Sequence, residues 1–255
     1  MEQSRRPYQP FSTITEAFDP LYHTTGNSLQ VGMHKRCSRG FLINAESQWI
    51  RVLGVENHQN PTAIGDSYGN ISNITPQTLE VSYQYEFPFG KGRMLFGSAS
   101  GLADRIISGW QLGGVTSFQP GQPFSVVYTA PGSQVYGASG RANLVPGVPL
   151  YPAQKSRAEW FNPAAFAAPP AYTFGNSAYD MLWGPHYQNW DMNLEKNVAL
   201  AERYKLQPRA EVFNVANHPN FSVPSSAVSN PTSDGVISSV VNEDRTLEFA
   251  AKFRF

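Results

Sequence analysis

The sequence predicts an all-β protein of antiparallel strands, and three observations support this prediction. Apolar and polar residues alternate with a period of two in several segments, which is the pattern of a strand with one apolar face. The chain has 21 Gly and 20 Pro among 255 residues, enough turn formers to separate many strands. Its 16 Phe, 12 Tyr and 5 Trp favour strands over helices.

Composition excludes several classes of protein. Lys plus Arg and Asp plus Glu both number 19, so no charge excess points to nucleic acid. No apolar run reaches the roughly 18–20 residues of a transmembrane helix, and the first residues lack the apolar run of a signal peptide. The one cysteine, Cys37, excludes an internal disulfide and a multi-cysteine metal site. We expect no enzyme activity, no metal and no cofactor, because the five histidines are scattered and no carboxylate pair is suitably spaced.

The first half of the chain contains a hairpin followed by two more strands. Alternation in residues 29–33 and 41–49, across a short Gly-containing turn, predicts the hairpin. Residues 79–87 alternate most regularly, and residues 102–107 fit one helical turn before the next strand. We interpret Gly109 to Tyr128 as one long strand kinked at Pro120 and Pro123, and residues 11–18 as a possible extra strand.

The second half continues the pattern beyond a very long connection, Ala130 to Gln188. Alternation predicts strands at 190–197 and 204–212, joined by a short turn around Ala199 to Glu202. The connection Asn214 to Arg245 follows, with a short strand expected at Val236 to Val240.

The last strand has one apolar and one charged face. Its apolar face consists of Leu247, Phe249, Ala251, Phe253 and Phe255. An aromatic C-terminal strand of this kind resembles the closing strand of outer-membrane barrels, whose terminal aromatic residue is recognised by the insertion machinery. An ordinary edge strand of a soluble domain is the alternative.

The lengths of the connections favour a barrel over a sandwich. Counted back from the C-terminus they are about 32, 5, 59, 20, 24 and 4 residues, so long and short alternate with one exception. Outer-membrane barrels have long external loops and short periplasmic turns. The fold class predicted is therefore all-β: an antiparallel transmembrane β-barrel, with about seven or eight meandering strands present.

The strand faces agree with a water-filled lumen. The polar faces carry too many ionised groups for a packed core. The residues predicted to face the lumen are Glu80, Gln84, Glu86, Asp191, Asn193, Glu195, Lys205, Gln207, Arg209, Glu211, Glu248, Lys252 and Arg254. Aromatic residues near strand ends fit the interfacial belts of a membrane protein. The predicted belt comprises Trp49, Tyr85, Phe87, Trp110, Trp190 and Tyr204.

Six short motifs, in order, resemble one family. They are PFGKGR (88–93), GWQLGGV (109–115) with PGQPFSV (120–126), WFNPAAFAAP (160–169), GPHYQNWDMNLEKN (184–197), RAEVFNVANHPNF (209–221) and the terminal Phe strand. Together they are similar to the C-terminal part of the barrel of TonB-dependent receptors of the Oar-like type, which carry an N-terminal carboxypeptidase-regulatory-like domain. The resemblance implies a Gram-negative outer-membrane receptor with a plug inside about 22 strands, energised through TonB.

The resemblance also implies partners and a domain assignment. The partners are outer-membrane lipid, the barrel-assembly machinery, the N-terminal barrel strands and plug of the same receptor, and TonB through the plug; no nucleic acid is expected. No plug, regulatory-like domain or TonB-contacting segment is visible, so we expect residues 1–255 to be the C-terminal segment of a barrel domain. Pro208 departs from the family pattern and removes a ladder donor.

The sequence leaves three functions open. The first is a fragment of a TonB-dependent receptor, with the connections Ala130 to Gln188 and Asn214 to Arg245 contacting ligand. The second is a self-contained small outer-membrane barrel acting as a pore or adhesin, since eight strands suffice to close a barrel. The third is a soluble β-sandwich that binds carbohydrate through aromatic loops.

Overall fold

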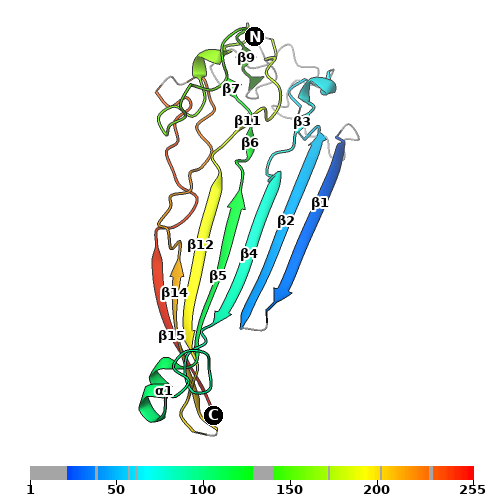
Figure 1. The fold of residues 1–255 in the computed structure, drawn as a ribbon. Coiled ribbons are helices and arrows are strands. Elements are labelled where there is room, and N and C mark those ends of the chain that lie inside the picture. The colour runs from blue at the N-terminus through cyan, green and yellow to red at the C-terminus, as the bar shows by residue number, and fades with distance from the viewer. Residues whose placement is uncertain are drawn as a thin grey trace, which may run out of the picture.

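One antiparallel sheet dominates the computed structural model, which describes residues 22–37, 40–56, 58–60, 63–128, 140–171, 173–201, 203–229 and 232–255. Seven long strands form a meander in which each pairs with the next long strand along the chain (Figure 1). They are β1 (Thr24–Arg36), β2 (Phe41–Gly54), β4 (Gln77–Glu86), β5 (Trp110–Gln119), β12 (Tyr187–Lys196), β14 (Lys205–Phe213) and β15 (Thr246–Arg254). The predicted all-β antiparallel fold is confirmed, whereas the extra strand predicted at residues 11–18 lies outside the described residues.

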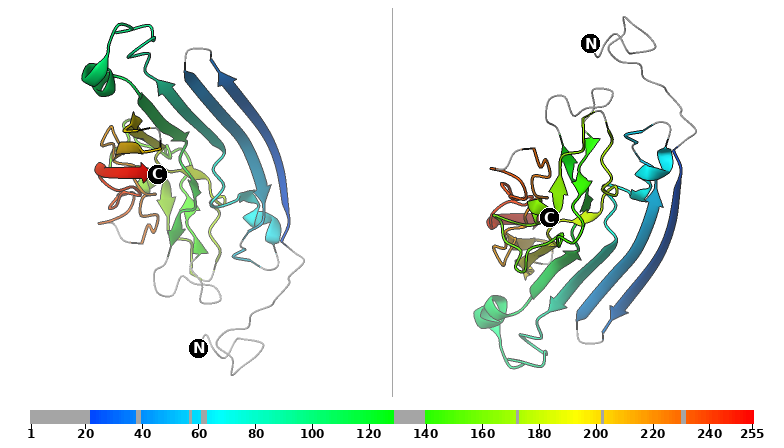
Figure 2. Two further views of the ribbon diagram at one scale, coloured as in Figure 1. Left: turned by 90° about the horizontal axis from the view of Figure 1, so that it is seen from below. Right: turned by 90° about the horizontal axis from the view of Figure 1, so that it is seen from above.

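The sheet is bent into an open arc, with β1 at one edge and β15 at the other (Figure 2). No ladder within the described part of the chain joins β1 to β15. Because consecutive strands of the meander are antiparallel, the first and the seventh run in the same direction. The two edges are therefore parallel to each other.

The connections are sorted between the two ends of the sheet, as the sequence predicts. The end of β1, the start of β2, the turn carrying β13 (Val198–Ala199) and the C-terminus lie at one end (Figure 1). The connections that follow β2, β5 and β14 lie at the other end. The connection between β4 and β5 is longer than the other turns at its end, and it contains the predicted helical turn as α1 (Gly101–Ile107).

The prediction of one long strand from Gly109 to Tyr128 is wrong, although the chain keeps the same direction throughout this segment. β5 ends at Gln119, and the chain continues as β6 (Pro123–Phe124) and β7 (Val127–Tyr128), which pair with β11 (Leu182–Trp183) and β8 (Gly140–Arg141). Pro120 and Pro123 have no N–H to donate to a sheet ladder. Because the chain does not turn back here, the sorting of the connections is preserved (Figure 1).

The short strand predicted at Val236 to Val240 is also wrong. Only Val240 forms an isolated bridge, with Phe221. The segment does run antiparallel to residues 220–225, since Val241 N donates to Asn220 O, Ser222 N to Ser239 O and Ser225 N to Val236 O. Ile237 N donates instead to Arg157 O, so the pairing is interrupted and no continuous ladder forms.

Pro208 marks the point where the β12–β14 ladder stops. β14 pairs with β15 along its whole length, including Pro208 opposite Ala251. Only Arg209 to Val212 pair with β12, so this ladder ends at the residue that follows the proline. Before the proline, Leu206 pairs with β13 instead. The N–H that Pro208 lacks therefore falls between the part of β14 paired with β12 and the part paired with β13, so little pairing is lost.

A separate hydrophobic core lies in the long connections, in a region that we call the cap (described residues of 120–186). Its strands and turns include β9 (Asn143–Leu144), η3 (Pro163–Ala165) and β10 (Phe166–Ala167), with β9 paired to β10. Its core consists of Phe124, Val126, Ala142, Phe161, Ala165, Phe166 and Leu182. Among the described residues, none of the buried hydrophobic side chains belongs to the seven long strands.

Polar contacts tie the cap to the connection that carries η2 (Ile64–Ser67) and β3 (Gly69–Asn70). The Ser125 hydroxyl and Asp180 are joined by two hydrogen bonds of 2.8 Å, and Asn70 Nδ2 donates to Asp180 O at 2.8 Å. Burial raises the pKa of Asp180, and the Ser125 hydroxyl opposes this shift. Arg141 donates to Ser67 Oγ at 3.3 Å, and burial lowers its pKa.

We predict that the cap depends on its own core. Leu182→Ala removes a side chain that is 0% exposed and should lower the free energy of cap opening by about 2–5 kcal/mol through the cavity it leaves. Proteolysis of the whole chain in increasing urea measures this opening. Leu200→Ala, in the turn between β12 and β14, is the matched control and should change it by less than about 0.5 kcal/mol; equal effects would contradict a distinct cap core.

Candidate functional site: the two faces of the sheet

All residues predicted to face the lumen lie on one face of the sheet. Directly opposite residues in antiparallel strands point to the same side. Glu86 lies opposite Gln111, Gln111 opposite Glu195, Glu195 opposite Arg209, and Arg209 opposite Ala250. Alternation along each strand then places the full predicted set on this side, which we call the polar face: Glu80, Gln84, Glu86, Asp191, Asn193, Glu195, Lys205, Gln207, Arg209, Glu211, Glu248, Lys252 and Arg254. That the polar face lines a lumen stays a prediction.

The opposite side, which we call the apolar face, carries large hydrophobic side chains that no other layer of the described chain covers. Phe249 is 80% exposed and Leu29 is 60% exposed. By register and alternation this face carries Leu29, Val31, Met33, Trp49, Leu79, Tyr85, Trp110, Phe118, Trp190, Leu194, Leu247, Phe249, Ala251 and Phe253. An exposed apolar surface of this extent is typical of contact with a membrane or a partner.

Aromatic residues on the apolar face fall at two levels. Near the cap, Phe118 and Trp190 meet edge to face at 5.4 Å between ring centroids. Near the turns, Phe41 contacts Tyr85 at 6.2 Å, and Tyr204 stacks on Phe253 at 5.8 Å. On β2, Trp49 and Phe41 are eight residues apart, about 26 Å at the strand rise. This spacing matches the roughly 25 Å apolar band between the aromatic girdles of a membrane barrel.

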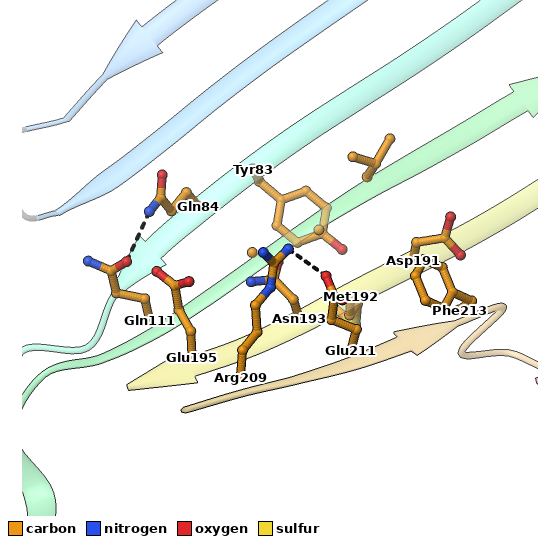
Figure 3. A pocket seen from close by; sticks show the side chains of 13 residues that line it. Tyr83, Gln84, Gln111, Asp191, Met192, Asn193, Glu195, Arg209, Glu211 and Phe213 are labelled. Atoms are coloured by element: carbon orange, nitrogen blue, oxygen red, sulfur yellow. Dashed lines mark hydrogen bonds and ion pairs between the residues drawn. The ribbon is translucent and has the colours of Figure 1, made fainter. Parts of the chain in front are cut away.

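The polar face contains a hollow of about 550 Å³ lined by β4, β5, β12 and β14 (Figure 3). Arg209 forms an ion pair of 2.5 Å with Glu211 and lies opposite Glu195. Asp191 also lines the hollow, at its other end beside Phe213. Gly113 leaves room here for the side chain of Asn193, since a Cβ at this glycine would come 2.5 Å from Asn193 Oδ1.

Two pairs of carboxylates lie directly opposite each other on the polar face. They are Glu46 with Glu80, between β2 and β4, and Glu211 with Glu248, between β14 and β15. Like charges in this position destabilise a sheet. A second hollow of about 520 Å³ includes the first pair in its lining. The excess of carboxylates suits water or a cationic partner at this face.

Sequence reasoning missed part of both faces. Glu46 was not in the predicted lumen set, although it alternates with apolar residues in β2, and Phe41, Phe118 and Phe253 were not in the predicted belt. Phe41 and Phe118 lie near strand ends, and this position in the sequence is enough to predict that they belong to the belt. The contact of Tyr204 with Phe253 joins residues far apart in the sequence and needed the register.

The described part of the chain offers neither a cluster of metal ligands nor a helix of membrane-spanning length. Among its residues, no three His, Cys, Asp or Glu side chains are grouped as metal ligands would be. No described helix is long and apolar enough to span a membrane.

Comparison with known proteins identifies a family. The model of the family described as outer membrane beta barrel domain matches residues 1–248. Neither the curated proteins nor the solved structures contain a match to the chain. The family match contradicts a soluble carbohydrate-binding sandwich, which would need a second sheet over the apolar face. The described residues place no sheet there.

We predict opposite tolerance of charge on the two faces. Val81→Arg, on the apolar face of β4, should destabilise the membrane-inserted protein by about 2–4 kcal/mol. Ser82→Arg, one residue on and on the polar face, should have little effect. Guanidinium unfolding from phospholipid vesicles, followed by tryptophan fluorescence, measures both variants; equal losses would show that neither face contacts hydrocarbon.

We also predict that the cross-strand carboxylate pair costs stability. Glu80→Gln should raise the free energy of unfolding by about 0.2–1 kcal/mol at low salt, because it removes repulsion from Glu46. Glu86→Gln is the matched control on the same strand face, since Glu86 lies opposite Gln111 and accepts its hydrogen bond at 3.3 Å. A gain that persists in high salt, or that appears equally at Glu86, would argue against this repulsion.

Proposed function

Because the chain belongs to the family of outer membrane β-barrel domains, we propose that it is the C-terminal part of a TonB-dependent receptor of the Oar-like type. In this proposal it completes the barrel of a Gram-negative outer-membrane receptor that takes up a ligand with energy supplied through TonB. The chain contributes barrel wall, external loops and lumen surface, and no catalytic residue.

The open sheet of seven long strands in the described part of the chain is the observation that carries the proposal. Hydrocarbon cannot satisfy the backbone groups of an open strand edge, so a spanning sheet has to close. β1 and β15 run in the same direction, and closure with only antiparallel pairs therefore needs an odd number of further strands. The N-terminal barrel strands of the same receptor would supply them.

The polar face supports a wide barrel with a plug. An eight-stranded barrel is just wide enough for its own side chains to fill. Here the polar face has two hollows of about 550 and 520 Å³, and carboxylates on neighbouring strands lie directly opposite each other. A plug with cationic side chains would occupy these hollows, and TonB would act on the barrel only through that plug.

The cap supports a role in ligand contact at the outer surface. Between the cap and the upper ends of β1 and β2 lies a hollow of about 610 Å³. Ile71, Ile74, Pro123 and Trp183 contribute apolar surface to it. We infer that ligand first binds on this external side, at the cap and the connection that follows β14.

The C-terminal strand supports recognition by the barrel-assembly machinery. β15 is an edge strand of the described sheet; its Phe249 is 80% exposed, and Phe255, directly after it, is 93% exposed. A free edge ending in an exposed aromatic residue is available for pairing with another chain.

A self-contained small barrel, acting as a pore or adhesin, is the second candidate. The family assignment and the two-faced strands favour it equally. It requires an eighth strand that pairs with both β1 and β15, because seven strands alone would close through one parallel pair.

The coding DNA tests the choice between the two. We expect the DNA immediately 5′ of the Met1 codon to continue, in frame or after a frameshift, into further alternating strands, a plug and a signal peptide. A stop codon and an unrelated gene there would contradict the receptor proposal. In that case, ion conductance and heat-modifiable gel mobility of the isolated chain in lipid vesicles would support the small barrel.

A further inference from the structure

The connection between β4 and β5 forms a small lobe, Pro88 to Ser108, at the end of the sheet where the short turns lie (Figure 1). We call it the turn lobe. It exposes large apolar side chains to a degree unusual for a loop in water: Met94 is 72% exposed, Phe96 is 65%, Leu102 is 74% and Ile106 is 60%. Figure 2 shows α1 projecting beyond the ends of β4 and β5.

The helix α1 turns its apolar side outward. Asp104 faces the rest of the lobe, because its Oδ1 accepts a hydrogen bond from Lys91 N at 2.6 Å. Leu102 and Ile106, four residues apart, share the side that points away. A helix on a soluble protein has the opposite arrangement, with its polar side outward.

The lobe lies on the side of the sheet that carries the apolar face. Trp110 and Lys196 lie opposite each other on that face, at the turn end of β5 and β12. The indole Nε1 of Trp110 donates to Ile106 O at 3.0 Å, and Lys196 Nζ donates to the carbonyls of Ile106 and Ser108 at 2.6 and 2.7 Å. The C-terminal end of α1 is thereby fixed against the apolar face.

Aromatic side chains make the apolar face continuous with the lobe. Tyr85 contacts Phe87 and Phe87 stacks on Phe89, both at 5.3 Å between ring centroids. Phe89 then meets Phe96 edge to face at 6.0 Å. The row of rings runs from the aromatic residues at the turn end of the apolar face to the exposed apolar side chains of the turn lobe.

Basic residues accompany this cluster. Lys91, Arg93 and Arg105 are all exposed, and they lie in or beside the segments that carry Met94 and Ile106. Exposed apolar side chains next to cations fit the boundary between acyl chains and phospholipid phosphates.

We propose that the turn lobe is an interfacial anchor in the inner leaflet of the outer membrane. Met94, Phe96, Leu102 and Ile106 insert at the level of the upper acyl chains, and Lys91, Arg93 and Arg105 bind lipid phosphates. The occupant is phospholipid, because the lobe continues the face assigned to lipid and its cations complement anionic headgroups. The inference depends on membrane insertion of the sheet and not on TonB-dependent uptake.

Site-specific labelling tests the anchor. In a Cys37→Ser background, Leu102→Cys and Ile106→Cys each carry a fluorescent label. The labelled chain, expressed together with the further strands that its gene encodes so that the sheet can close, is then inserted into phosphatidylethanolamine and phosphatidylglycerol vesicles with lipids brominated at shallow and deep positions of the acyl chains. Val81→Cys on the apolar face is the positive reference, and Gln84→Cys on the polar face is the negative one. We expect quenching at positions 102 and 106 to be close to that at 81 and at least about twofold stronger than at 84.

The references separate failure of the anchor from failure of the membrane assignment. Quenching at 81 but not at 102 or 106 would overturn the anchor alone. Absence of quenching at all positions would contradict both. As a second measurement, Arg93→Glu with Arg105→Glu should weaken quenching at 102 in the mixed vesicles more than in pure phosphatidylethanolamine; an equal effect would remove the phosphate contacts from the proposal.

Discussion

The antiparallel ladder is the constraint on which the rest of the structure depends. In hydrocarbon each backbone N–H and C=O needs a partner, and seven consecutive long strands provide one another with partners. Residues that lie directly opposite each other in these ladders point to the same face, so the register decides for all strands at once which side chains share a face. A shift of one residue in any strand would move its charged side chains, such as Glu195 or Arg209, to the apolar face.

The molecule therefore has two regions stabilised by different means. The seven strands contain none of the buried hydrophobic side chains among the described residues, so their apolar face depends on an environment outside the chain. The cap instead packs Phe124, Phe161 and Leu182 against one another. Its packing resembles that of a small soluble domain, and contacts such as that of Asn70 with Asp180 connect it to the segment that follows β2.

The strands were predictable from sequence and the cap was not. Period-two alternation located all seven strands and placed the bounds of β4, β12, β14 and β15 within three residues, because a sheet with lipid on one side and polar surroundings on the other enforces it along each strand. It underestimated the lengths of β1 and β2 and carried β5 past Pro120. The cap has no such period: β6 pairs with β11 across a long stretch of chain, and Gly121 approaches the carbonyl of Gly184 too closely for any Cβ. Residue order reveals neither contact. The thirteen charged and polar positions on one face were predictable, whereas the opposition of Glu46 to Glu80 required the register.

Two features of the sheet are unfavourable in isolation, and one explanation accounts for both. Among the described residues the outer edges of β1 and β15 have no ladder partner, and the polar face has two pairs of opposed carboxylates, the first of which borders a hollow. Lipid could cover the apolar face but would relieve neither of these. Additional strands would satisfy the edges, and a cationic domain inside the barrel would occupy the hollows and neutralise the carboxylates. A receptor with a plug provides both, whereas a narrow barrel closed by one extra strand would satisfy the edges and leave the opposed carboxylates crowded together.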